Sequence, residues 1–295
     1  MKTMPSPEFL KGLILTATLL LEGNSAPTEK PLVVLITSYN NIEWYKRNLS
    51  SILRQNYSNY RVIYIDDASP DGTGQAVANY VQKNDPLKRV TVLRNKTRQR
   101  KLKNIYKAVH TLNDNDIIVQ IDGDDWLAHN NVLDCINRAY TTGDTWISYG
   151  TSIRYHGKKK GYGKKVPSKA VTDVTNRRSF LTRDWAILPV RTFYAWLFKK
   201  IKKCDLLTKD VAGFKGDFYP CTDDIAFMQP MLEMAGSGHI KFIDEVLYEI
   251  NLTNTASEYH SQRKLQLSCR REILERVPYV PLKNTTIPSP CCKGK

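Results

Sequence analysis

Short apolar runs alternate with longer amphipathic stretches through the first half of the chain. The run at residues 32–36 is continuous and rich in β-branched side chains, which is typical of a strand buried on both faces. Three similar runs follow, and the segments between them carry apolar residues at helical spacing. The pattern predicts strands at residues 32–36, 60–65, 90–93 and 117–121, and helices from residue 42 and over residues 102–112. This alternation predicts an α/β fold with a doubly wound, mostly parallel sheet, whose ligands bind at the carboxyl ends of the strands.

The strand predicted at residues 117–121 runs into a group of carboxylates, Asp122-Gly123-Asp124-Asp125. Mg²⁺ and Mn²⁺ prefer oxygen ligands, and Mg²⁺ usually takes one or two carboxylates and completes its coordination with water and substrate phosphates. The group therefore predicts a site for a divalent cation and a diphosphate. Asp and Gly are also common turn residues, so a plain turn after a strand is the alternative.

Four polar motifs together resemble those of the inverting family 2 glycosyltransferases, which have the nucleotide-sugar-binding GT-A fold. They stand in the family's order and spacing over about residues 31–250. The motifs are Thr-Ser-Tyr-Asn at 37–40, Asp-Asp-Ala-Ser-Pro-Asp-Gly-Thr at 66–73, Asp-Gly-Asp-Asp at 122–125 and Thr-Asp-Asp-Ile at 222–225. The resemblance implies a GT-A fold and a nucleotide-sugar donor.

The resemblance also implies roles for particular side chains in the first three motifs. The residues that would hold the uridine of a UDP-sugar are Thr37, Tyr39 and Asp67. Those that would meet the ribose, the metal and the diphosphate are Asp122, Asp124 and Asp125. The chemistry suits these roles, because a carboxylate can accept the imide N–H of uracil and an aromatic ring can stack on the base. The alternative for Asp67 is turn chemistry around Pro70 and Gly72.

Inversion requires a carboxylate that deprotonates the acceptor hydroxyl on the face opposite the leaving diphosphate. Asp224 is the candidate base, and it lies in the first turn of a helix predicted by the apolar spacing of residues 225–232. Acidic residues are also favoured at helix starts as caps. Capping suits Thr222 or Asp223 better, which would leave Asp224 free. In the family that this chain resembles, the second acid of the corresponding pair is the base.

Weaker matches lie elsewhere in the chain. In several related enzymes a late histidine contacts the metal or the diphosphate, so the resemblance suggests His260 as a further metal ligand; an ordinary histidine is the alternative. Arg191 opens a segment that looks like an acceptor-side element, where it could meet the diphosphate or an acidic acceptor, or simply carry surface charge. The segment 95–104 lacks the glycine and the Ala-Arg-Asn sequence common in the family.

The 295 residues, with 41% hydrophobic and 25% charged content, are enough for one sizeable globular domain with an appended acceptor region. The expected division is a leader at 1–30, a nucleotide-sugar-binding half at 31–130, an acceptor-binding half at 131–250 and a C-terminal tail at 251–295. A last strand is predicted within residues 240–248.

The formal net charge is +15, and part of it is concentrated in residues 154–169. This segment predicts a basic loop that could close over the acceptor or touch an anionic membrane, and a plain solvated loop is the alternative. The chain has no zinc-finger spacing, RNP-like aromatic motif or heptads, which argues against specific nucleic-acid binding.

The termini and the cysteines leave the compartment open. The apolar stretch 13–21 is too short to span a bilayer but has the length of a signal-peptide core, and an amphipathic or disordered leader is the alternative. The location is therefore either membrane-associated and cytoplasmic or, with a signal peptide, the secretory lumen. The six cysteines show no Cys-x-x-Cys spacing and do not indicate zinc.

These observations favour an inverting glycosyltransferase that depends on Mn²⁺ or Mg²⁺. It would move a hexose from a UDP-sugar to a hydroxyl of a glycan, lipid or protein. A nucleotidyltransferase of related fold is the enzymatic alternative, and it would bind free nucleoside triphosphates. A catalytically silent module is the other, and it would bind sugars or phosphates without turnover.

Overall fold

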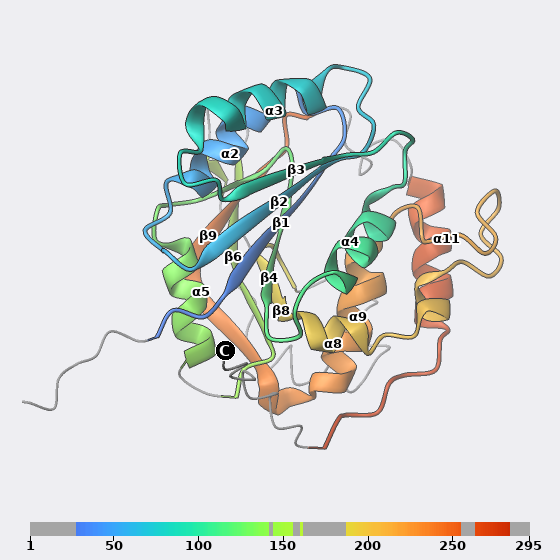
Figure 1. Ribbon diagram of the computed structural model, residues 1–295. Helices are drawn as coiled ribbons and strands as arrows, with labels where there is room; N and C mark the ends of the chain where they lie inside the picture. Colours follow the sequence, from blue (N-terminus) through green and yellow to red (C-terminus); the bar gives the residue numbers. More distant parts are fainter. Residues whose placement is uncertain (1–27, 142–143, 156–159, 162–186, 255–262, 284–295) are drawn as a thin grey trace, which may run out of the picture.

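The structure is a computed structural model that describes residues 28–141, 144–155, 160–161, 187–254 and 263–283. Within them, nine strands form one sheet that is flanked by helices (Figure 1). The strands are β1 Leu32–Ser38, β2 Tyr60–Asp66, β3 Val90–Arg94, β4 Ile117–Asp122, β5 Trp126–Leu127, β6 Ile147–Tyr155, β7 Lys160–Gly161, β8 Arg191–Tyr194 and β9 Ile240–Asn251. The helices are α2 Tyr45–Leu53, α3 Thr73–Asn84, α4 Lys101–His110, α5 Val132–Thr141, α8 Ala195–Lys199, α9 Asp223–Ala235 and α11 Arg263–Leu274, with short 3-10 turns η2 Lys203–Leu206 and η3 Ser237–His239.

The order of the sheet is β3-β2-β1-β4-β8-β6-β9-β5, with β7 paired to β6. The first four strands of this order are parallel, and β8 runs antiparallel to both β4 and β6. Because β2 lies on one side of β1 and β4 on the other, right-handed crossovers place α2 and α3 on one face of the sheet and α4 on the opposite face. The order reverses at β1, and in open α/β sheets such a switch point is where ligands bind.

The predicted strands are confirmed, with small shifts at their ends. Leu32 to Ile36 of β1 are fully buried, as are Ile117 to Val119 of β4, which explains why these strands appear in the sequence as continuous apolar runs. The helices between them bury one face, for example Leu49 and Ile52 of α2. The expected α/β fold with a central sheet flanked by helices is therefore observed.

The second half of the sheet departs from the pattern that the sequence suggests. Arg154 and Tyr155, placed in the basic loop by their composition, end β6 and pair with Gly161 and Lys160 of β7. The loop prediction is wrong for these four residues because backbone pairing in a ladder does not require apolar side chains. The rest of the segment 154–169 lies outside the described residues.

The residues that the structure describes include only part of the predicted division of the chain. The expected leader lies outside the described residues except for 28–30, and the boundary at residue 130 stays a prediction. Residues 263–274, in the segment expected to be a tail, form α11, which packs against α9. Among the described residues, no helix combines the length and the apolar character needed to cross a bilayer.

Candidate functional site

Three of the polar motifs meet at one edge of the sheet because their strands are neighbours. In the β1–β4 pairing Thr37 stands opposite Asp122, and in the β1–β2 pairing Ser38 stands opposite Asp66. The backbone continues this contact beyond the strands, since the N–H of Gly123 donates to the carbonyl of Thr37 (3.0 Å) and that of Asp67 to Ser38 (2.9 Å). The carboxyl ends of β1, β2 and β4 thus form one polar rim.

A cavity of about 1000 Å³ opens at this rim. Its wall is completed by the start of α4, the segment before β8, the start of α9 and part of α11. The structure brings together here all the predicted site residues that it describes, namely Thr37, Tyr39, Asp67, Asp122, Asp124, Asp125 and Asp224. His260 lies outside the described residues, so its suggested role as a metal ligand stays a prediction.

The part of the cavity beside β1 and β2 is rich in hydrogen-bonding groups. The Thr37 hydroxyl is buried and has no hydrogen-bond partner, which suits a polar ligand. The Asp67 carboxylate accepts the backbone N–H groups of Gln99 (2.8 Å) and Arg100 (2.7 Å) and the side-chain amide of Asn95 (2.7 Å). Asp67 therefore fixes the segment after β3 against the cavity, in addition to facing the cavity itself.

The Tyr39 ring is covered on one face by the guanidinium of Arg98, 3.8 Å from the ring centroid. A nucleotide base that stacked on this face of the Tyr39 ring would have to displace Arg98, because the guanidinium already occupies the space in which the base would lie. In the segment after β3, which lacks the sequence common in the family, Asn95 donates to both Asp67 and Asn104.

The acidic motif after β4 concentrates negative charge in a confined space. Burial raises the pKa of Asp124, and the charge of Asp122 raises it further. Burial likewise raises the pKa of Asp125 well above its usual range, with the charges of Asp124 and Asp122 adding to the effect. Neighbouring carboxylates disfavour each other's ionisation, so a divalent cation bound between them would stabilise their ionised forms. Carboxylate oxygens are also the ligands that Mg²⁺ and Mn²⁺ prefer.

Two of the acids are held in place by groups from the end of β9 and from the segment that follows it. Asp125 accepts the backbone N–H of Asn251 (2.7 Å) and a hydrogen bond from the Tyr248 hydroxyl. Asp124 accepts the side-chain amide of Asn254 (2.8 Å). Asp125 is almost fully buried whereas Asp124 is partly exposed to the cavity, so Asp124 is the better placed of the two to contact an ion.

Lys101, at the start of α4, joins the acidic motif to α9. Its ammonium lies 2.7 Å from Asp122 and 3.2 Å from Asp223. Although burial acts to raise the pKa of Asp122, the charge of Lys101 holds it below its usual range. Sequence reasoning missed Lys101, because no local pattern marks a lysine whose two partners lie far from it in the chain.

Asp224 lies at the start of α9 beside a buried arginine. Its carboxylate pairs with Arg191 of β8 (3.1 Å), and its other oxygen accepts the backbone N–H of Ile225 (2.9 Å). The sequence suggests Arg191 as a contact of the diphosphate or of an acidic acceptor, and the structure places it in the cavity wall against Asp224. The base candidate is therefore not free but oriented by a cation.

The expectation that Thr222 or Asp223 caps α9 is wrong. Thr222 has a left-handed backbone (φ 59°) and no side-chain cap bond; its hydroxyl instead donates to the carbonyl of Gln266 in α11 (3.4 Å). Asp223 pairs with Lys101. Burial raises the pKa of Asp223, although Lys101 counteracts this. Both side chains serve contacts with other elements, which local helix rules do not anticipate.

Gly123 occupies a position that tolerates no side chain. A Cβ atom there would lie 2.6 Å from both Asn41 Nδ2 and Ser38 Cβ. We expect Gly123→Ala to lower the free energy of unfolding by about 1–3 kcal/mol, because overpacking in a well-packed site costs that much. It should also weaken donor binding, since the neighbouring acids would shift.

Thermal unfolding and calorimetry would measure the two effects of Gly123→Ala. Gly238→Ala is the matched control, because a Cβ at Gly238 meets nothing within 4 Å. Equal unfolding temperatures for both variants would contradict the close packing of the acidic motif.

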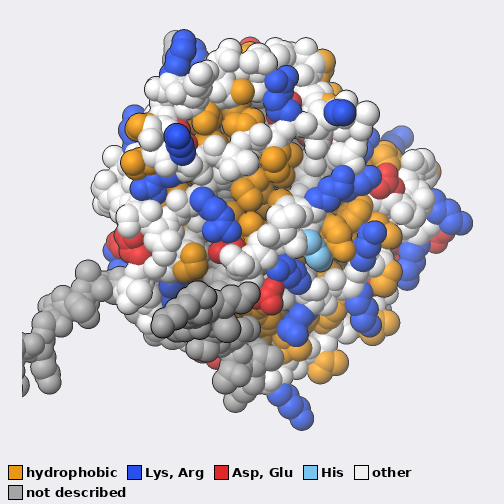
Figure 2. All heavy atoms as spheres, viewed as in Figure 1, with side chains coloured by type: hydrophobic (Ala, Val, Ile, Leu, Met, Phe, Trp, Pro, Cys, Tyr) orange, Lys and Arg blue, Asp and Glu red, His pale blue; other side chains and the backbone are white. Residues whose placement is uncertain are grey.

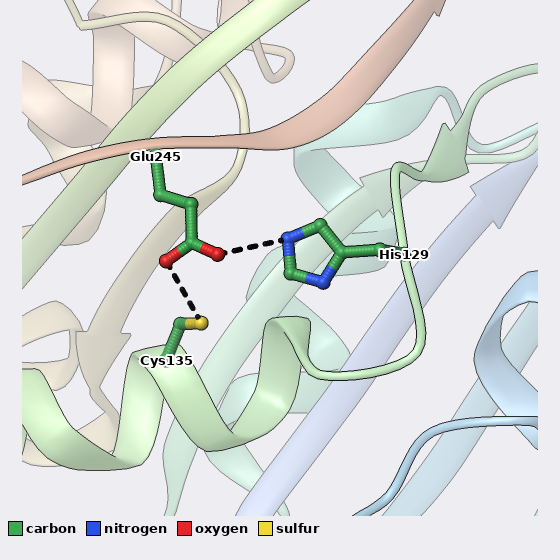
Figure 3. A group of neighbouring side chains, drawn as sticks. All are labelled: His129, Cys135 and Glu245. Carbon is green, nitrogen blue, oxygen red and sulfur yellow. Dashed lines mark hydrogen bonds and ion pairs between the residues drawn. The ribbon is translucent and has the colours of Figure 1, made fainter.

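A second group of ligand-type side chains lies away from this cavity (Figure 3). Among the described residues, His129, Cys135 and Glu245 bring an imidazole nitrogen, a thiol and a carboxylate within 4.8 Å of one another. His129 Nε2 lies 3.4 Å from Glu245, and the Cys135 thiol donates to the other oxygen of Glu245 (3.2 Å). None of the three lines the cavity.

Hydrogen bonding explains this group without a metal ion. The backbone N–H of Asn131 donates to His129 Nδ1 (3.2 Å), which in the neutral ring leaves the proton on Nε2, facing Glu245. Burial and Glu245 raise the pKa of Cys135 to about 11, so the thiol stays protonated and Arg138 also contacts its sulfur (3.1 Å). The group connects α5 to β9, and we assign no metal to it.

Comparisons with known proteins agree with this geometry. The model of glycosyl transferase family 2 matches residues 33–203. The crystal structure of S. aureus TarS 1–349 in complex with UDP-GlcNAc has 17% sequence identity and a TM-score of 0.54, covering 79% of this chain and 61% of that one. The mannosyltransferase PcManGT from Pyrobaculum calidifontis, in complex with GDP-Man and Mn²⁺, has 16% identity and a TM-score of 0.51, covering 90% of this chain and 70% of that one.

At this level of identity the two likenesses show the fold, and they confirm the expected GT-A type. The chain spans less than two thirds of the length of the TarS chain. No curated protein matches the chain in sequence.

Proposed function

This chain belongs to glycosyl transferase family 2, and from that membership we propose that it transfers a hexose from a UDP-sugar to a hydroxyl acceptor with inversion at the anomeric carbon. The observation that carries the proposal is the single cavity in which the ends of β1, β2 and β4 meet the start of α9. In this arrangement, groups that suit a nucleotide, groups that suit a diphosphate and a carboxylate that can act as the catalytic base all lie within reach of one bound donor.

In the proposed arrangement the donor lies along the rim of the sheet. Thr37 and Asp67 hold the uridine, with Tyr39 stacking on the base once Arg98 has moved aside. Asp122 and Asp124 lie next to the ribose and the diphosphate. The similar TarS structure holds UDP-GlcNAc, and PcManGT holds GDP-Man. Proteins of similar fold therefore differ in the nucleobase of the donor. The proposed preference for uracil rests on the roles of Tyr39 and Asp67.

The acceptor approaches from the α9 side of the cavity. Asp224 takes the proton of the acceptor hydroxyl as its oxygen attacks the anomeric carbon, which forms the new glycosidic bond as the bond to the diphosphate breaks. Arg191 orients the Asp224 carboxylate through their ion pair. Lys101 keeps α9 close to the acidic motif by contacting both Asp122 and Asp223.

A divalent cation, Mn²⁺ or Mg²⁺, fits the acidic motif by the type and the charge of its ligands. Asp124 and Asp125 would hold it, and when bound it would supply neutralisation of the charge that develops on the departing UDP. The raised pKa values of both carboxyls are consistent with this assignment, because they reflect burial first and then the negative charge of the neighbouring carboxylates, which a cation would offset.

The acceptor is a glycan, a lipid or a protein, and the charge of the chain bears on this choice. Figure 2 shows Lys and Arg side chains spread over one face of the molecule, where acidic side chains are fewer. With a net charge of +15, this surface supports peripheral contact with an anionic membrane as part of the proposal.

A donor panel tests the proposed function without knowledge of the acceptor. With Mn²⁺ present, UDP and UDP-sugars should bind more tightly than GDP, ADP or nucleoside triphosphates, and one UDP-sugar should be slowly hydrolysed. Calorimetry measures the binding, and NMR of the first-formed free sugar measures inversion, because an α-linked donor should release the β-anomer.

Three outcomes of this panel would overturn the proposal. Preference for triphosphates would favour a nucleotidyltransferase, and release of the donor's own anomer would exclude inversion. Tight UDP binding with neither hydrolysis nor transfer would indicate a catalytically silent module.

A further inference from the structure

Two cysteines lie in contact at the acceptor side of the cavity. Cys221 lies two residues before the first residue of α9, and Cys269 lies on α11. Their sulfur atoms are 3.6 Å apart, with the Cys221 thiol donating to Cys269, and both side chains are buried. They come from segments 48 residues apart in the sequence, so the contact depends on the folded structure.

The cysteine pair is part of a wider contact between the start of α9 and α11. The Thr222 hydroxyl donates to the carbonyl of Gln266 in α11. Cys221 itself lines the cavity, as do Gln266, Leu267 and Arg270 of α11. Cys221 therefore borders the cavity and is 2% exposed, whereas Cys269 does not line the cavity and has no exposed surface.

The surroundings of Cys269 favour its reactive form. Hydrogen bonds from the Cys221 thiol and from the backbone of Cys221 lower the pKa of Cys269, although burial opposes this. Once Cys221 is in a mixed disulfide its thiol can no longer donate, but the hydrogen bond from its backbone still lowers the pKa of Cys269. The thiolate is the nucleophile in disulfide exchange, so Cys269, next to the Cys221 sulfur, is suited to close a disulfide.

We propose that Cys221 and Cys269 form a reversible disulfide that controls the position of the start of α9, where Asp224 lies. The oxidant is a small-molecule disulfide such as oxidised glutathione. Cys221 attacks it and releases one thiol, and Cys269 then attacks the Cys221 sulfur of the mixed disulfide and releases the second. The protein loses two electrons and two protons, and the oxidant gains both as two free thiols.

Closing the bond has a direct consequence for Asp224. A disulfide bond is about 2.05 Å long, so the sulfurs must approach each other by about 1.5 Å from their 3.6 Å separation. Asp224 follows Cys221 by three residues, and a displacement of about 1 Å can cost roughly 100-fold in rate. The disulfide should therefore lower glycosyl transfer by about 10- to 100-fold, and this part rests on the proposed function. Donor affinity should hardly change, because the donor-binding strands are not moved.

The test compares the native protein after treatment with oxidised glutathione and after reduction with dithiothreitol. Peptide mapping without reduction should find a Cys221–Cys269 linked peptide in the oxidised sample only. The oxidised protein should unfold at a temperature higher by about 5 °C, since a disulfide constrains the unfolded chain. Its transfer activity should fall and recover on reduction, while UDP affinity stays the same.

Cysteine variants separate the pair from other thiols. Cys221→Ser, which removes the thiol that attacks the oxidant, should abolish the linked peptide and make transfer insensitive to the oxidant, with Cys221→Ala as a second variant if serine is poorly tolerated in the core. Cys204→Ser is the matched control, because Cys204 is an exposed thiol, and it should respond as the native protein does.

Absence of the linked peptide, or equal transfer in the oxidised and reduced forms, would overturn the inference. The peptide and the unfolding temperature are measured without any activity. Failure of the disulfide is therefore distinguishable from failure of the proposed function, which would appear as no transfer in either redox form.

Discussion

Asp224→Asn is expected to lower glycosyl transfer by about 10²- to 10⁴-fold, the usual contribution of general-base assistance. Asparagine keeps the shape of the side chain and can still contact Arg191, but it cannot accept the proton of the acceptor hydroxyl. Affinity for the UDP-sugar should change little, because Asp224 lies at the start of α9 and not among the strand ends that would hold the donor. The measurement is a comparison of kcat with the dissociation constant of UDP for both proteins.

Asp223→Asn is the control for the Asp224 variant, since it makes the same change at the neighbouring position. Asp223 is paired with Lys101, so its loss should weaken the bridge through which Lys101 links α9 to the acidic motif, with a smaller effect on transfer. If instead Asp223→Asn abolished transfer and Asp224→Asn left it unchanged, Asp223 would be the base. Full activity in both variants would place the base elsewhere in the chain.

The sequence predicts the donor half well because its strands are buried on both faces. Such strands must be apolar throughout, so the runs at 32–36 and 117–121 are visible without any knowledge of their partners. The polar residues that follow them come together for a geometric reason, since the carboxyl ends of parallel strands lie at one edge of the sheet. The strand pattern therefore predicted a ligand site at these strand ends, and the resemblance to the family singled out Thr37, Asp67 and Asp122 within it.

The acceptor half was less predictable because its contacts link residues that are far apart in the chain. Lys101 lies between Asp122 and Asp223, and Arg191 reaches Asp224, yet none of these pairs has a local signature. The capping prediction failed for the same reason, since the Thr222 hydroxyl turns to α11 and not to its own helix. Local rules describe an isolated helix, whereas here tertiary partners decide where the polar side chains point.

Asp124→Asn is expected to change metal binding and stability in opposite directions. It removes a charge from the acidic motif, so Mn²⁺-dependent affinity for UDP should fall by at least about 10- to 100-fold, since even changes to groups behind a metal ligand cost that much. The metal-free variant should nevertheless be more stable than the native protein at pH 7. The reason is that the native motif holds ionised carboxyls that burial and neighbouring charges disfavour.

The pH dependence follows from the sign of these pKa shifts. The pKa values of Asp124 and Asp125 are raised in the folded state, so their contribution to stability is fully present below the unfolded value of about 3.9 and is lost as the pH rises through the folded values. Without metal, the stabilising effect of Asp124→Asn should thus be larger at pH 7 than at pH 4. Thermal unfolding at both pH values, with and without Mn²⁺, measures this difference in stability, and Mn²⁺ should raise the unfolding temperature of the native protein more than that of the variant.

Asp134→Asn is the control, because it makes the same change at an i,i+4 ion pair on α5, and it should alter none of these responses. If Mn²⁺ stabilised the Asp124 variant as strongly as the native protein, the ion would not be held by Asp124. If the metal-free variant were less stable at pH 7, burial and the neighbouring charges would not disfavour the ionised carboxyls as their pKa shifts indicate.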